Sequence, residues 1–102
     1  MSKEKLLKKI HAEEKEFIDA MMLRSPAEII EAAYEIAHKR DIICILETTS
    51  IPDEQAKAIG CLANSLDFFY WVWMDCDGDS LKDAIDYALT EEWKHILVTE
   101  AE

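Results

Sequence analysis

The sequence LDFFYWVWMDCDGD, residues Leu66 to Asp79, places a dense aromatic segment directly before a dense acidic one. At 3.6 residues per turn, its apolar side chains cover nearly the whole circumference of a helix. One face of that helix holds Leu66, Phe69, Tyr70 and Trp73, and Phe68, Trp71 and Val72 flank or oppose it. A small domain accommodates such a helix either at its centre or at an interface. The segment therefore predicts an all-α bundle around residues 66–74.

The composition supports the same fold class. Half of the 102 residues are apolar and only four are Gly or Pro, which favours helices over a turn-rich sheet. The length suits a single domain, residues 1–102, of five or six short helices. We find no signal-peptide pattern and no apolar run long enough to span a bilayer, so we expect a cytoplasmic protein.

The three cysteines predict neither a disulfide framework nor a zinc site. Cys44, Cys61 and Cys76 are odd in number and form no CxxC pair. We expect each of them to be a small hydrophobic side chain that is buried or half-buried.

The net charge of −11 is unevenly distributed along the chain. Residues 1–24 carry six basic and five acidic side chains, a net charge of +1, whereas residues 67–102 carry ten acidic and two basic ones, a net charge of −8. An acidic surface repels nucleic acids and membranes and attracts basic partners. Direct binding to nucleic acid or to a membrane is therefore disfavoured.

Apolar spacing and capping signals predict two long helices in the first part of the chain. The first is expected at about Lys3–Leu23, with the charged residues Lys9 and Glu13 outside its apolar stripe. The second begins at the capping box Ser25-Pro26-Ala27-Glu28 and extends to about Arg40. Its inward face is expected to hold Ile29, Ile30, Ala33 and Ala37.

The remaining helices are expected to be shorter. A short buried helix over residues 41–47 is favoured over a lone strand, because no other segment offers a pairing partner. Thr49 or Ser50 is expected near the cap of the next helix, Asn64 and Ser65 cap the aromatic one, and Asp79 or Ser80 caps the last. Thr90 is expected to begin a final helical segment that carries Trp93, Ile96 and Leu97.

Acidic side chains form two ladders on the predicted helices. Carboxylates three or four residues apart on a helix have Cβ atoms roughly 5–6 Å apart, similar to the separation of successive phosphates on a nucleic-acid strand. Together with the acidic turn after the aromatic helix, the ladders could imitate a nucleic-acid backbone; alternatively, they serve solubility alone. The candidate partner-binding residues are Glu28, Glu31, Glu35, Asp75, Asp77, Asp79, Asp83 and Asp86.

The segment Asp75–Asp86 partly matches an EF-hand loop, with aspartates at loop positions 1, 3, 5, 9 and 12. Ser80 replaces the usual glycine, Lys82 replaces a hydrophobic residue, and Asp86 replaces the usual bidentate glutamate. We therefore expect no bound metal or other cofactor, with weak calcium binding as an alternative. Widely spaced histidines and the lack of a glycine-rich loop also argue against an enzyme.

Two segments, SPAEIIEAAYEIAHKRDI (residues 25–42) and IPDEQAKAI (residues 51–59), carry a family resemblance. They resemble the central pattern of a small uncharacterised domain family of bacteria and their mobile elements, over roughly residues 5–75. The resemblance implies a role in defence or counter-defence, where small acidic proteins include anti-CRISPR inhibitors, some of which mimic DNA. It implies no activity for particular residues.

These observations favour a non-catalytic acidic protein that inhibits a basic, nucleic-acid-binding protein such as a CRISPR nuclease. The alternative is a structural or regulatory protein that forms a homodimer or larger homo-oligomer through exposed aromatic side chains. Trp71, Trp73 and Trp93 are the candidates for such a surface.

Overall fold

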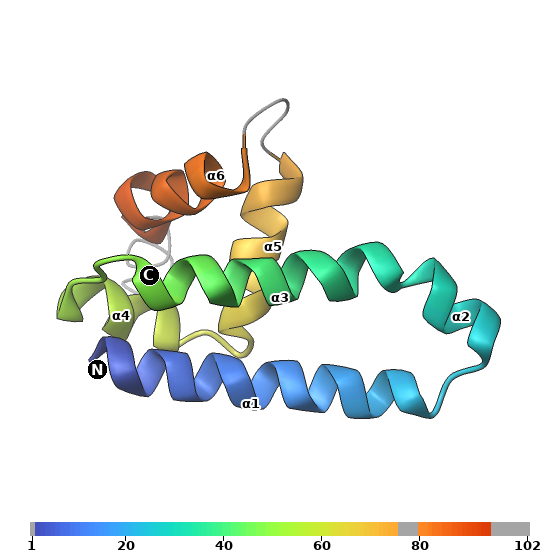
Figure 1. Cartoon of the computed structure of the whole chain (residues 1–102). Coiled ribbons are helices and arrows are strands. Elements are labelled where there is room, and N and C mark those ends of the chain that lie inside the picture. Colours follow the sequence, from blue (N-terminus) through green and yellow to red (C-terminus); the bar gives the residue numbers. More distant parts are fainter. Residues whose placement is uncertain (1, 76–79, 95–102) are drawn as a thin grey trace.

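The computed structural model describes residues 2–75 and 80–94 (Figure 1). Within them the chain forms six α-helices, one short π-helical segment and no strand, which confirms the all-α prediction. The elements are α1 (Lys3–Met22), α2 (Pro26–Glu31), α3 (Ala33–Thr48), α4 (Asp53–Gly60), α5 (Ser65–Asp75), α6 (Leu81–Tyr87) and the π-helical segment η1 (Ala88–Glu92).

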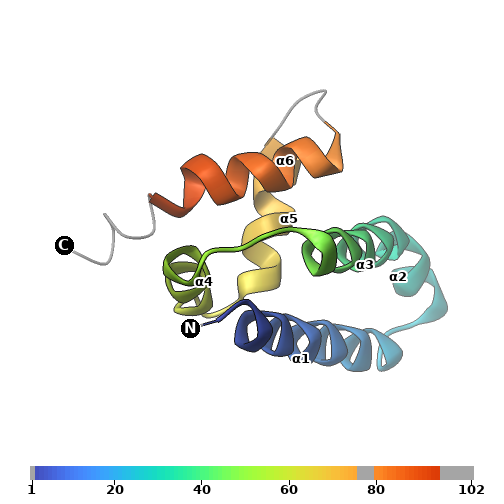
Figure 2. The ribbon, with the colours of Figure 1, turned by 60° about the vertical axis from the view of Figure 1, so that its left-hand side comes forward.

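The aromatic helix α5 is the centre of the bundle, as its sequence predicts. Helices α1 and α3 lie antiparallel, α2 connects them at one end, and α5 crosses the pair (Figures 1 and 2). Helix α5 contacts α1, α3, α4, α6 and η1. Its side chains Leu66 and Phe69 are almost completely buried, but Trp71 is 60% exposed, so one face of the helix remains open to solvent.

Helix α1 contains one side chain that the sequence places wrongly. Leu6 and Ile10 are buried as expected, but Glu13 is also buried, in contrast to its predicted place outside the apolar stripe. The spacing explains its position, because residues four and then three apart share one face of a helix. A carboxylate is stable there because it has specific hydrogen-bond partners, which are described below.

The helix break predicted at Arg40-Asp41 is wrong. Ser25 caps α2 as expected, and its hydroxyl accepts a hydrogen bond from the Glu28 N–H (3.3 Å), but α2 ends at Glu31. Helix α3 then continues through Arg40-Asp41 to Thr48. Neither residue is a helix breaker, and Arg40 forms an ion pair with Glu14 of α1 (3.1 Å).

The break at the end of α2 also changes which side chains of this region face inward. Ile30, Ala33 and Ala37 are exposed, in contrast to the prediction, and Ile29 is half-buried. A single continuous helix would have kept these residues on one face, but the chain passes through Ala32 into a second helix. The apolar spacing of one continuous helix therefore does not predict which side chains of residues 29–37 face inward.

The predicted caps are right for the two later helices and wrong for α4. Pro52 occupies the cap position of α4, and no side chain caps that helix. The Asn64 side chain accepts a hydrogen bond from the Asp67 N–H (2.9 Å), and Ser80 does the same for the Asp83 N–H (3.2 Å). Thr90 begins no new helix, because α6 passes directly into η1. Ile96 and Leu97 lie outside the described residues.

Two of the three cysteines differ from the prediction. Cys44 and Cys61 are exposed free thiols, and Cys76 lies outside the described residues. Cys44 lies on α3 between the buried Ile43 and Leu46, on the outward side of the helix, and Cys61 follows the last residue of α4. None of the helices in the described ranges is long and apolar enough to cross a membrane.

Candidate functional site

The buried carboxylate of Glu13 holds the start of α5 against α1. The Ser65 N–H donates to its Oε2 atom (2.9 Å) and the Leu66 N–H donates to Oε1 (3.0 Å). Lys9, one turn earlier on α1, forms an ion pair with the same carboxylate and also donates to the Leu62 carbonyl oxygen (3.0 Å). A negative charge at the positive end of the α5 dipole is favourable. These contacts fix the position of the aromatic helix.

A second charged group joins α5 to α3. Lys39 is 4% exposed, and its ammonium forms ion pairs with Glu35 (2.7 Å) and Asp67 (2.8 Å). The ammonium also lies 3.9 Å from the centre of the Phe17 ring and 5.5 Å from that of Tyr70. Burial alone lowers the pKa of Lys39, but the hydrogen bonds and the charge attraction to Asp67 and Glu35 together outweigh burial, and the pKa is raised. The lysine therefore remains charged.

An aromatic cluster joins α3 to α5. The His38 ring stacks on Trp73, with ring centres 4.3 Å apart, and Tyr34 lies against both, 4.0 Å from His38 and 5.5 Å from Trp73. Tyr34 is 54% exposed. Trp73 also contacts Tyr70, whose pKa is raised by burial and by the nearby charge of Glu35. These contacts attach α5 to α3 and leave the Tyr34 ring at the surface.

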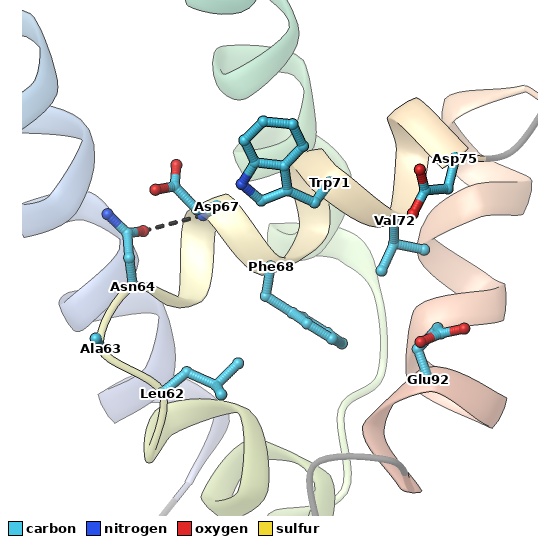
Figure 3. A pocket seen from close by; sticks show the side chains of 9 residues that line it. All are labelled: Leu62, Ala63, Asn64, Asp67, Phe68, Trp71, Val72, Asp75 and Glu92. Atoms are coloured by element: carbon cyan, nitrogen blue, oxygen red, sulfur yellow. Dashed lines mark hydrogen bonds between the residues drawn. The ribbon is translucent and has the colours of Figure 1, made fainter.

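The exposed side of α5 borders a pocket of about 400 Å³, which we call the Trp71 pocket (Figure 3). Its apolar part includes the half-buried Leu62 and Phe68 and the buried Val72, and Trp71 stands at its edge. The nine described residues that line it are Leu62, Ala63, Asn64, Asp67, Phe68, Trp71, Val72, Asp75 and Glu92.

The polar side chains of the Trp71 pocket are predominantly acidic. Asp67, Asp75 and Glu92 line it, and none of the described lining residues is basic. Figure 3 shows Asp67 on one side, near Trp71, and Asp75 and Glu92 on the other side. Asp67 is paired with Lys39, but Asp75 and Glu92 form no ion pair within the described part of the chain.

The first predicted ladder is divided by the break between α2 and α3. Glu28 accepts hydrogen bonds from Ser25 (3.2 Å) and Arg24 (3.2 Å), and Glu35 is paired with Lys39. Of the three glutamates, only Glu31 has no ion pair with another described residue. The ladder therefore does not present three unpaired carboxylates in a row.

The second predicted ladder lies on α6, which packs against α3, α5 and η1. Asp83 and Asp86 are exposed, and neither forms an ion pair with a described residue. Asp77 and Asp79 lie outside the described residues. Helix α2, by contrast, is at the far end of the α1–α3 pair (Figure 1). Asp75 and the α6 carboxylates thus lie on two helices that contact each other, whereas Glu28 and Glu31 lie on α2.

Glu92 and Asp67 are acidic residues of the Trp71 pocket that the sequence does not single out as candidates. Glu92 lies with Asp75 at this pocket, whereas the exposed Asp83 and Asp86, three residues apart on α6, form what we call the acidic face. The signal was available, because Ile85, Leu89 and Glu92 are four and three residues apart and so approach the inner side of a helix. Ile85 and Leu89 are buried, as this spacing predicts, and Glu92 follows them on the same side of the helix and lines the Trp71 pocket.

The described residues contain no group of three His, Cys, Asp or Glu side chains that could hold a metal ion. The calcium loop proposed for Asp75–Asp86 includes positions 76–79, which lie outside the described residues. Comparison with known proteins finds no matching family model, no matching curated protein and no matching solved structure. The family resemblance of residues 5–75 therefore stays a prediction.

Proposed function

We propose that this chain is a non-catalytic acidic protein that binds a basic partner protein through its acidic face. One observation carries the proposal: Asp83 and Asp86 are exposed on one side of α6, and neither forms an ion pair with a described residue. Lys94, one of the two basic residues after position 66, is already paired with Glu91 (3.5 Å).

The energetic argument rests on the like charges of this face. Asp83 and Asp86 are three residues apart on α6, a spacing at which like charges repel and destabilise a helix by a few tenths of a kcal/mol, about 0.2–0.5. A lysine- or arginine-rich surface removes this repulsion when it binds. It also associates faster, because opposite charges steer the encounter.

The class of partner follows from the same chemistry. Proteins that handle nucleic acids carry clusters of lysine and arginine that neutralise phosphates. A face of closely spaced carboxylates can occupy such a cluster and exclude the nucleic acid. The proposed function is therefore inhibition of a nucleic-acid-binding protein, and a CRISPR nuclease is the partner that the family resemblance and the anti-CRISPR analogy suggest.

The test uses the protein immobilised and exposed to a bacterial lysate fraction enriched on heparin. We expect a basic protein to be retained, to be released as salt is raised, and to be displaced by duplex DNA. The variant Asp83→Lys/Asp86→Lys should lose this partner. The matched variant Glu16→Lys/Asp19→Lys changes the net charge equally on α1 and should retain it. Equal retention by both variants would contradict the proposal.

A second candidate function is self-assembly through exposed aromatic side chains. The observation that favours it is the exposure of Tyr34 (54%), Trp71 (60%) and Met74 (46%) on α3 and α5. Exposed apolar groups of this size are common at protein interfaces. Sedimentation over a wide range of protein concentration tests it: the candidate requires a mass that rises with concentration, and a constant monomer mass would exclude it.

A further inference from the structure

We propose that the Trp71 pocket receives an amphipathic segment of the partner, with an apolar side chain in the pocket and an arginine on the Trp71 indole. This inference rests on the proposed function, because it assigns a specific docking point to the same basic partner. It goes beyond the acidic face, since it predicts that binding also requires an apolar contact and a particular cation.

The apolar part of the pocket provides the first step of the argument. Leu62 and Phe68 are only half-buried, and Trp71 at the edge is 60% exposed. Removal of such apolar surface from water favours binding. A partner that binds through charge alone would leave the apolar surface of the pocket exposed to water. An apolar side chain from the partner covers it and adds affinity that salt does not weaken.

The carboxylates determine which segment fits. Asp75 and Glu92 flank the apolar part, have no ion pair in the described part of the chain, and come from two elements, α5 and η1. An acidic segment would bring like charges together and would be repelled. A purely apolar segment would remove water from the carboxylates without compensation. A segment with basic side chains next to an apolar one satisfies both parts of the pocket.

The fold already holds one of its own cationic groups, the ammonium of Lys39, in the same manner. Lys39 lies against the Phe17 ring at 3.9 Å and is paired with Asp67 and Glu35. Trp71 with Asp75 presents the same two components, an aromatic face and a carboxylate, but at the surface. Arginine suits this site better than lysine, because its planar guanidinium can stack on the indole while it donates two hydrogen bonds to a carboxylate.

The experiment measures binding of synthetic peptides to the full chain by isothermal titration calorimetry, with amide NMR shifts to locate the contact. The first peptide is an amphipathic helix with leucines flanked by arginines. Three matched peptides replace every arginine by lysine, every arginine by glutamate, or every leucine by serine. We expect saturable binding of the arginine–leucine peptide, about threefold weaker binding of the lysine peptide, and no binding of the other two.

Substitutions in the protein then localise the contact. Trp71→Ala should weaken binding at least about tenfold, and Met74→Ala, exposed on the same helix but outside the pocket, should change it less than about twofold. Asp75→Asn/Glu92→Gln should weaken binding about three- to tenfold, and the remote pair Glu16→Gln/Asp19→Asn should leave it nearly unchanged.

The outcomes separate this inference from the proposed function. If Trp71→Ala still binds the peptide with unchanged affinity, the pocket assignment is wrong. If Asp83→Lys/Asp86→Lys abolishes capture of the basic partner while Trp71→Ala captures it normally, the proposed function holds and the pocket is not its docking point. Absence of peptide binding would also overturn the inference. A mass that rises with protein concentration, and no longer does so in Trp71→Ala, would overturn it as well, because it would assign the pocket to a second copy of the chain.

Discussion

Replacement of Glu13 by alanine should destabilise the fold more than any other loss of a single acidic side chain in α1. The change leaves the Ser65 and Leu66 N–H groups without their carboxylate acceptor and removes the ion-pair partner of Lys9. Hydrogen bonds to a charged group contribute about 1.5–3 kcal/mol each, and loss of one partner of a buried ion pair costs about 3–5 kcal/mol.

These contributions overlap, because the same carboxylate makes all three contacts. Lys9 also retains its hydrogen bonds to the Leu62 carbonyl oxygen and the Ser65 hydroxyl, both 3.0 Å. We therefore expect the free energy of unfolding to fall by about 3 kcal/mol, the lower end of that range. For a domain of this size, 3 kcal/mol corresponds to a decrease in Tm of about 12–24 °C.

Urea denaturation followed by far-ultraviolet circular dichroism measures the change. Glu13→Gln keeps one oxygen acceptor and should lose about half as much stability, roughly 1.5 kcal/mol. The control Glu16→Ala removes an exposed carboxylate from the same helix and should change stability by less than about 0.5 kcal/mol. A Glu13→Ala variant within about 1 kcal/mol of wild type would refute the capping role of Glu13.

Three further predictions concern other parts of the fold. The pKa values of Lys39 and Tyr70 are raised, so the folded state holds both protons more tightly than the unfolded state. The free energy of unfolding should therefore fall as pH rises above the ordinary pKa values of 10.5 and 10.0. Urea titrations at alkaline pH should show a smaller fall in this free energy for Lys39→Met than for wild type. Asn64→Ala should cost about 1 kcal/mol through the lost cap of α5, whereas Ala63→Ser at the preceding exposed position should cost little. Cys44 and Cys61 should react with a thiol reagent in the native protein as fast as in denatured protein; protection of either would contradict its exposure.

The sequence predicts those features of the fold that depend on local chemistry. Ser25, Asn64 and Ser80 act as caps because each side chain accepts a hydrogen bond from the backbone N–H three residues ahead, which requires no distant partner. The central position of α5 follows from its apolar side chains, whose burial requires surrounding helices. The spacing of Leu6, Ile10 and Glu13 contains the inward position of Glu13, but its hydrogen bonds to Ser65 and Leu66 and the ion pair of Lys39 with Asp67 join different helices, and no single-helix pattern contains them.

The candidate site was predictable to a similar extent. Asp83 and Asp86 follow from helical spacing and are exposed as expected. The pairing of Glu35 with Lys39 has the i,i+4 spacing that favours an ion pair on a helix, but the approach of Asp67 of α5 to the same lysine depends on the packing of the helices. The Trp71 pocket required the approach of η1 to α5, which places Glu92 opposite Trp71. Its two sides are about twenty residues apart in the sequence.

The most direct test of the acidic face is the salt dependence of binding to the captured basic partner. Wild type and Glu16→Lys/Asp19→Lys should lose affinity with the same steep slope against the logarithm of salt concentration. Asp83→Lys/Asp86→Lys should bind at least about tenfold more weakly at low salt, with a shallower slope. Equal affinities and equal slopes for all three proteins would contradict the account and leave the acidity of α6 without a role in binding.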